Sequence, residues 1–441
     1  MFSRIRFDRK FIFAAVATLI AALSLTMAPA ARAVNAVPDA MPTGTETLLY
    51  SFGVGPTPDK CKLMDGANPK GSLTYAPATG LLLGRTSTTT AKGPGFGTIF
   101  QIMPNGSSYV VDNYFAGAKT DGADPENNAM TLVGDVLYGT TLTGGKNNTG
   151  AIFSLNDDGS SYSSPLVFNF PASGTKNFSA GPYSCFLPVG SVLYGMSSLG
   201  GKHSNGVIYS FDTSTSTFTR AYSFDGGHGS NPHGQLILDP NGKTFYGMTP
   251  TGGTADVGVV FSFTRTCSAA NSKCKTKIKV LHDFNCPHNG IPMCTGGSGA
   301  TPDHGTLVQS GTTLFGLTAN GGKFGNGTLF SIQTNGQHFT TLLNFGRPGS
   351  NDGISPLGSL TLDGTTLYGT TRLGGNKGNG SVFRINTDGT GYDRIWDFQG
   401  ATSDGKNPDD DVIVIGNTLY GMTELGGQCG FGAIFALVPP P

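Results

Sequence analysis

The chain has 441 residues, of which only 13% are charged and 67 are glycine. Charged residues are therefore about half as common as the ~25% of an average protein, and glycine is about twice as common as its usual ~7%. The 28 basic and 28 acidic side chains balance. Without a net field to attract phosphates or an anionic membrane surface, we expect no nucleic-acid partner.

The N-terminus has the three parts of a secretory signal peptide. A basic region at residues 4–10 precedes an apolar run at residues 11–25, and an Ala-x-Ala cleavage signal ends at Ala33. The apolar run is shorter than the ~20 residues that a helix needs to cross a bilayer. We therefore expect residues 1–33 to be a signal peptide, followed by a short leader at residues 34–44. The mature chain would be secreted, into the periplasm or the extracellular space, with no membrane insertion after the signal is removed.

One phrase then returns seven times, most clearly as GTTLYGTTRLGGNKGNGSVFRI at Gly364–Ile385. The glycine of its Leu-Tyr-Gly triplet falls at Gly84, Gly139, Gly195, Gly247, Gly316, Gly369 and Gly421. The spacings are 55, 56, 52, 69, 53 and 52 residues. Such a period indicates supersecondary units that bury their apolar faces only by stacking on their neighbours.

Two other positions recur with the same period. A hydroxyl residue stands two positions after each triplet glycine, at Thr86, Thr141, Ser197, Thr249, Thr318, Thr371 and Thr423. A phenylalanine ends a third phrase, at Phe52, Phe115, Phe170, Phe224, Phe284, Phe345 and Phe398. We expect seven copies of a residue to serve the architecture, and the hydroxyls to satisfy backbone groups between neighbouring units.

Within each unit the apolar residues alternate with period two between Gly, Asn and Asp turns, which is typical of strands. The sixth unit predicts strands A, B, C and D at 357–362, 365–371, 381–386 and 392–398. Asp363-Gly364 and Asp388-Gly389 are suited to the tight A–B and C–D hairpin turns. A Gly-Gly segment connects B to C, and a longer Asp-Gly-x-x-Pro segment connects D to the next A.

Seven such units predict an all-β, seven-bladed β-propeller at residues 45–437, with four antiparallel strands per blade and a tail at 438–441. The segment 47–52 resembles a lone D strand, and 432–437 resembles a C strand without its D. Pairing the two would complete the seventh blade from both ends of the chain. It would also remove the unpaired edges that an open ring exposes.

The repeat resembles the family of tandem GloVer repeats, whose units contain Leu-Tyr-Gly-Thr-Thr, Gly-Gly, Gly-x-x-Phe, Leu-x-x-Phe, Asp-Gly and Pro. The first unit departs from this pattern, with Leu83 at the aromatic position. The resemblance implies an extracellular bacterial propeller, in a family whose members often carry C-terminal anchors. It supplies no catalytic residues. This chain ends without a hydrophobic tail, so we expect release rather than anchoring.

The D–A and B–C loops should share one face, because strand direction alternates from A to D. This loop face is where a propeller ligand is expected. It gathers aspartates of the Asp-Gly-x-x-Pro segments and lysines of the Gly-Gly segments: Asp121, Asp225, Asp352, Asp404, Lys146, Lys202, Lys323 and Lys377. The carboxylates could hold calcium, act as acid and base towards a sugar, or simply form turns. We predict no other cofactor.

Histidines are concentrated in the loops of blades 3 to 5, at His203, His228, His233, His288 and His304. A histidine cluster can bind a transition metal or act as a general base, but no His-x-x-x-His spacing is present. We therefore assign no metal ligands and no catalytic residues. Our candidate binding residues are Asp121, Asp225, His228, His233, His304, Asp352 and Asp404.

Seven cysteines in an exported chain favour disulfides. Cys267–Cys274 and Cys286–Cys294 would each close a short loop within the additions that lengthen blade 4. Cys61 and Cys429 lie in the two loops of the closing region, and a bridge between them would hold the ring shut. Cys185 is left over, and we expect it to be inert because no histidine partner is fixed beside it.

These patterns favour a secreted, monomeric binding or scaffold module that recognises a glycan or an extracellular protein on the loop face. The sequence contains no Gly-x-Ser-x-Gly, His-Glu-x-x-His or dinucleotide-binding motif. The first alternative is an extracellular enzyme acting on polysaccharide, which rests on fold analogy. A histidine beside a carboxylate in a loop-face pocket would favour that enzyme. A second alternative is a purely structural envelope protein.

Overall fold

The structure is a computed structural model, and it describes residues 44–54, 61, 65–88, 95–126, 129–163, 166–172, 179–267, 274–285 and 295–441. The predicted signal peptide, His288 and the Cys286–Cys294 pair lie outside these residues. Within them no helix is long and apolar enough to cross a membrane.

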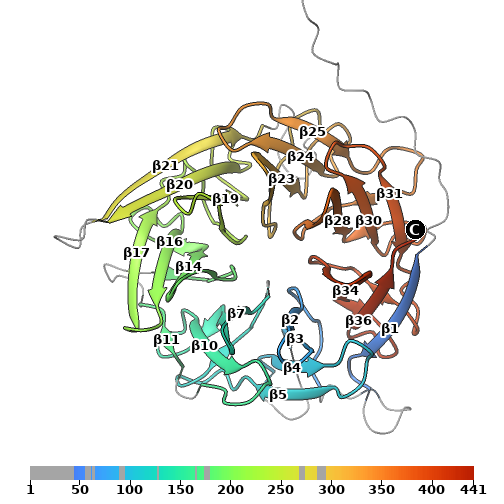
Figure 1. The fold of residues 1–441 in the computed structure, drawn as a ribbon, viewed down its shortest axis with the longest axis horizontal. Coiled ribbons are helices and arrows are strands. Elements are labelled where there is room, and N and C mark those ends of the chain that lie inside the picture. Colours follow the sequence, from blue (N-terminus) through green and yellow to red (C-terminus); the bar gives the residue numbers. More distant parts are fainter. Residues whose placement is uncertain are drawn as a thin grey trace, which may run out of the picture. The chain divides into compact units, whose positions relative to one another are not determined.

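Seven four-stranded antiparallel sheets stand in a ring about a common centre (Figure 1). The predicted seven-bladed β-propeller is therefore confirmed. Each sheet runs from a short innermost strand A to an outermost strand D, and hairpins connect most neighbouring strands. Blade 7 takes its outermost strand from the other end of the chain.

The strands of blades 1 to 4 follow in order from A to D. They are β2 (Thr74–Ala76), β3 (Leu81–Thr86), β4 (Thr98–Ile102) and β5 (Val110–Tyr114); β7 (Thr131–Val133), β8 (Val136–Thr141), β10 (Ala151–Asn156) and β11 (Phe168–Asn169); β13 (Leu187–Val189), β14 (Val192–Ser197), β16 (Val207–Asp212) and β17 (Thr217–Ser223); and β18 (Ile237–Leu238), β19 (Thr244–Thr249), β20 (Val259–Cys267) and β21 (Cys274–Asp283).

Blades 5 to 7 are built in the same way. Their strands are β22 (Val308–Ser310), β23 (Thr313–Thr318), β24 (Thr328–Gln333) and β25 (Thr340–Asn344); β27 (Thr361–Asp363), β28 (Thr366–Thr371), β30 (Ser381–Asn386) and β31 (Asp393–Asp397); and β33 (Ile413–Ile415), β34 (Thr418–Thr423), β36 (Ala433–Val438) and β1 (Thr45–Ser51).

Among the described residues, four two-stranded ribbons pair the D–A and B–C loops of single blades. They are β6 (Gly122–Ala123) with β9 (Thr143–Gly144), β12 (Ser179–Ala180) with β15 (Leu199–Gly200), β26 (Gly353–Ile354) with β29 (Leu373–Gly374), and β32 (Gly405–Lys406) with β35 (Leu425–Gly426). Single bridges such as Ser230 with Thr251 take their place in other blades. This pairing places the two kinds of loop on one face, as the alternating strand direction predicts.

Aromatic rings join the blades. The phenylalanine that ends each repeat is at most 1% exposed, and its ring meets the strand-C aromatic of the following blade at a steep angle. Phe115 lies against Phe153, for example, and Phe345 against Phe383, with ring centroids 5.4 and 5.3 Å apart. The same contact between Phe52 and Phe100 joins blade 7 to blade 1 at 5.3 Å. These edge-to-face contacts form the main apolar joints of the ring.

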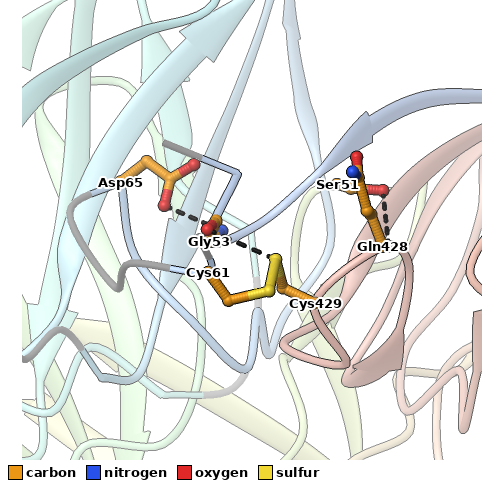
Figure 2. Close-up of a disulfide and its surroundings, with 6 residues drawn as sticks. All are labelled: Ser51, Gly53, Cys61, Asp65, Gln428 and Cys429. Atoms are coloured by element: carbon orange, nitrogen blue, oxygen red, sulfur yellow. Dashed lines mark hydrogen bonds between the residues drawn. A yellow bond between two sulfur atoms is a disulfide. The ribbon is translucent and has the colours of Figure 1, made fainter. Parts of the chain in front are cut away.

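The ring closes where β1 pairs antiparallel with β36, from Thr45 opposite Val438 to Ser51 opposite Ala433. Figure 1 shows this blue strand beside the last red one. Just beyond the pair, a disulfide joins Cys61 to Cys429 across 368 residues of sequence. Figure 2 shows the bridge next to Gly53, whose backbone N–H donates to Asp65 Oδ1 at 2.8 Å. Both the predicted strand closure and the predicted disulfide are confirmed.

The repeated hydroxyls act within blades rather than between them. All seven are fully buried, and six donate to the carbonyl two residues further along, as Thr249 does to Thr251 at 2.8 Å. The seventh, Thr371, bonds the Ser381 hydroxyl at 2.8 Å. Each hydroxyl therefore holds the start of its own B–C loop. Our expectation of bonds between neighbouring units was wrong, because the loop turns back at once and presents its own carbonyl.

Two features differ in extent from the sequence expectation. Strand A of blade 6 begins at Thr361 instead of Leu357, because the preceding segment packs against the next blade. A Cβ on Gly358 would lie 2.6 Å from the Asp410 carbonyl carbon.

In blade 4 the C–D hairpin of β20 and β21 is extended, and Cys267 pairs opposite Cys274 near its tip. These cysteines form the second predicted disulfide, which is also confirmed.

Candidate functional site

A proline stands before each innermost strand, and the residue after it varies between blades: six residue types fill the seven positions, with aspartate in blades 5 and 7. We call these seven residues the channel ring: Lys70, Glu126, Tyr183, His233, Asp303, Leu357 and Asp409. They lie a few residues before the strands A. Four of those strands, with Asp411, line a central hollow of about 720 Å³. The channel ring therefore stands at the end of the central channel that the loop face surrounds.

The scaffold under the channel ring is uniform. The residue before each proline has a positive φ, from 51° at Asn68 to 60° at Gly181. Each proline ring lies against the glycine that precedes strand C of the previous blade. A Cβ on Gly380, for example, would lie 2.6 Å from Pro408 Cδ. Because proline restricts the backbone, this packing delivers one variable side chain per blade to the channel mouth.

One part of the channel ring is a chain of ion pairs. Lys70 Nζ lies 3.3 Å from Glu126 Oε1 and 3.8 Å from Glu424 Oε1. Arg372 reaches Glu424 Oε2 at 2.7 Å and Asp409 Oδ1 at 3.1 Å. Arg372 and Glu424 come from the first B–C loop positions of blades 6 and 7. The chain thus links four blades, and its side chains range from 8% exposed at Asp409 to 34% exposed at Arg372.

The other part consists of rings and one carboxylate. Tyr183 lies against His233 with ring centroids 4.4 Å apart. Asp303 Oδ1 is 2.7 Å from His233 Nδ1 and 3.6 Å from His304 Nε2. Burial by itself would raise the pKa of Asp303, but the hydrogen bond with His233 and the charges of both imidazoles outweigh it and lower that pKa. Asp303 is therefore kept ionised between two histidines of adjacent blades.

Beneath the channel ring lies a second layer of ionisable groups. Arg85 is 3% exposed and donates to the Thr140 carbonyl at 3.0 Å, and burial lowers its pKa to about 10. Asp410 accepts a hydrogen bond from the Gly71 N–H. Burial, together with the neighbouring Asp410 charge, raises the pKa of Asp411 to about 7. Burial also raises the pKa of the free Cys185 thiol to about 12, which fits the inert thiol that we expected.

The four repeated aspartates are engaged in their own loops. Asp121 accepts from the N–H groups of Ala116 and Gly122 at 2.6 and 2.8 Å. Asp404 likewise accepts from Gln399 and Gly405, both at 2.6 Å. Asp352 accepts from Arg347, and Asp225 accepts from His228. This is turn geometry, and a ligand role for these aspartates stays a prediction.

Of the candidate binding residues, the structure brings together two separate pairs. His233 lies beside His304, with ring centroids 5.4 Å apart, and His228 pairs with Asp225, 2.8 Å away, where both side chains are well exposed. The four loop lysines are exposed as well. Sequence reasoning missed Asp303, Tyr183 and the ion-pair chain, although one signal was available: the position after the repeated proline carries six different residue types in the seven units.

Comparison with known proteins agrees with this architecture. The model of the Gloeobacter/Verrucomicrobia repeat matches residues 175–366 and 302–440, which together make up more than half of the chain. No curated protein matches.

Among solved structures, an extracellular domain provisionally assigned to a one component system of B. thetaiotaomicron is 12% identical, with a TM-score of 0.51. The match covers 90% of this chain but only 40% of that one. The periplasmic gluconolactonase of Pseudomonas aeruginosa is 14% identical over 84% of this chain and 88% of its own, with a TM-score of 0.47. Identities this low show a shared fold alone. The extent of the repeat match settles the family: the chain belongs to the Gloeobacter/Verrucomicrobia repeat family.

Proposed function

We propose that the protein is a secreted, monomeric binding module that holds a glycan over the channel ring. One observation carries the proposal. In a repeat whose glycines, hydroxyls, prolines and phenylalanines recur in every blade, the position facing the channel mouth carries six residue types in seven blades, with aspartate alone used twice. A structural role shared by all blades would call for the same residue seven times. Different side chains on identical supports are what an asymmetric ligand requires.

The chemistry of the channel ring suits a sugar. Lys70 and Glu126 offer a charged donor and a charged acceptor, and Tyr183 against His233 offers a ring surface with polar edges. Binding sites combine apolar surface with a few convergent polar groups in this way. A protein partner would favour a contiguous apolar patch. Among the described residues, the exposed large apolar side chains are Val110, Leu199, Leu373 and Val438, each on a different blade.

The location is part of the same proposal. Two disulfides lie within the described residues, and such bonds persist in oxidising compartments. Together with the signal-like N-terminus, this supports export to the periplasm or the extracellular space.

A second candidate function is hydrolysis or lysis of polysaccharide at the same place. The observation that favours it is the 2.7 Å contact between His233 Nδ1 and Asp303 Oδ1, because a carboxylate that orients an imidazole can prepare it as a general base.

The test is a glycan array probed with the purified protein, followed by product analysis of every hit. We expect saturable binding without product. Tyr183→Ala and Lys70→Ala should each weaken binding at least about fivefold, the effect of ~1 kcal/mol. The matched control is Lys243→Ala, an exposed lysine in the A–B turn of blade 4 on the opposite face, which should bind normally. Product release would instead support the enzyme, and an array without hits would contradict the glycan as ligand.

A further inference from the structure

His233, Asp303 and His304 form a compact group of metal-ligating atoms on two adjacent blades. One ligand atom from each lies within 4.8 Å of the other two. The sequence separates His233 from Asp303 by 70 residues, and only the stacking of blades 4 and 5 brings them together. In blade 5, Leu307 lies five positions after Pro302, whereas in blade 4 Leu236 lies four positions after Pro232. The extra residue in blade 5 allows the consecutive side chains of Asp303 and His304 both to approach His233.

The donor set distinguishes between classes of metal. Two imidazole nitrogens and one carboxylate oxygen suit zinc and its transition-metal neighbours. Calcium takes six to eight oxygen ligands, which these three residues do not supply. Three protein ligands would also leave a fourth position for water or for a group on a bound molecule.

One detail distinguishes this group from a simple hydrogen-bonded pair. A single oxygen, Asp303 Oδ1, faces both imidazoles, at 2.7 Å from His233 Nδ1 and 3.6 Å from His304 Nε2. By contrast, Asp225 and His228 make an isolated pair at 2.8 Å, with side chains 39% and 44% exposed. Within the part of the chain that the structure describes, the loop face therefore carries one converging triad and one ordinary pair of the same residue types.

We propose that His233, Asp303 and His304 bind one divalent transition-metal ion of the zinc class. The ligands are His233 Nδ1, Asp303 Oδ1 and His304 Nε2, with an open position at the channel mouth. This assignment goes beyond the proposed glycan binding and does not depend on it, because it follows from the donor atoms alone.

The test uses the untagged protein, freed of metal by chelation and titrated with Co²⁺ and with Zn²⁺. We expect one Co²⁺ per chain with visible absorption of a nitrogen- and oxygen-ligated ion, displaced by Zn²⁺ and not by Ca²⁺. His304→Ala and the isosteric Asp303→Asn should each weaken affinity at least tenfold, since loss of even an outer partner of a metal ligand costs about 10- to 100-fold.

His228→Ala is the matched control and should bind as the unmodified protein does. Near-UV circular dichroism establishes whether each variant is folded. If His304→Ala is unfolded, the metal affinity of Asp303→Asn, which preserves the shape of the side chain, tests the proposal instead. The proposal is overturned if the unmodified protein binds neither ion. It is equally overturned if the folded His233→Ala/His304→Ala variant binds with unchanged affinity. Neither result bears on whether glycans bind, so the two proposals fail separately.

Discussion

At the scale of the residue, the repeated glycine of each Leu-Tyr-Gly triplet is explained by an aromatic ring across the strand pair. A Cβ on Gly369 would lie 2.5 Å from Phe383 Cζ, and a Cβ on Gly139 would lie 2.3 Å from Phe153 Cζ. The ring covers the glycine and in turn receives the edge of the phenylalanine from the preceding blade. Glycine is needed here for space and not for unusual backbone angles.

We predict that Gly369→Ala destabilises the protein by about 1–3 kcal/mol, because the added methyl overpacks the Phe383 ring. Gly227→Ala is the control, since its Cβ would meet only Asp225 Oδ1, at 3.8 Å. Urea denaturation of both variants measures the difference. If Gly369→Ala were as stable as Gly227→Ala, the packing explanation of the repeated glycine would be wrong.

The residue scale also shows what the sequence could not predict. That the loop aspartates form turns was one of the alternatives, because Asp-Gly has strong local preferences. The triad of His233, Asp303 and His304 was not predictable, because its members meet only after blades 4 and 5 stack. Spacing along one chain segment reveals metal ligands on a helix or hairpin, but not ligands shared between neighbouring repeat units.

At the scale of the element, β1 decides whether the ring is closed. It covers the outer edge of β36, which would otherwise present unpaired backbone groups. The disulfide between Cys61 and Cys429 then links the same two ends covalently. This closure was predictable because the first and last repeat phrases are complementary halves of one unit.

The Cys61–Cys429 bridge should stabilise the protein more than the Cys267–Cys274 bridge does. It spans 368 residues rather than 7, and in the chain-entropy view a longer loop restricts the unfolded state more. We expect Cys61→Ser/Cys429→Ser to lose about 2–5 kcal/mol, with a smaller loss for Cys267→Ser/Cys274→Ser. Calorimetric melting of both variants measures which loss of stability is larger. A larger loss for Cys267→Ser/Cys274→Ser would show that the Cys61–Cys429 bridge does not stabilise the closed ring as we expect.

At the scale of the whole molecule, the repeated positions build the scaffold, and the channel ring supplies the varied side chains that we propose bind the ligand. The repeat builds seven nearly identical blades, and its regularity made the fold, the blade number and the closure predictable from sequence. The channel ring escaped prediction because its members share a position and not a residue type. Few charges are present in the chain overall, yet Lys70, Glu126, Arg372, Asp409 and Glu424 meet at the channel mouth.

The central claim is that the channel ring, and not the repeated aspartate loops, binds the ligand. The most direct measurement is a crystal structure of the protein with the best glycan from the array. The account predicts sugar density at the channel mouth, within hydrogen-bond distance of at least two channel-ring residues from different blades and with a sugar face against Tyr183. Density at the Asp121, Asp225, Asp352 or Asp404 loops, or on the outer strands, with an empty channel mouth would contradict it.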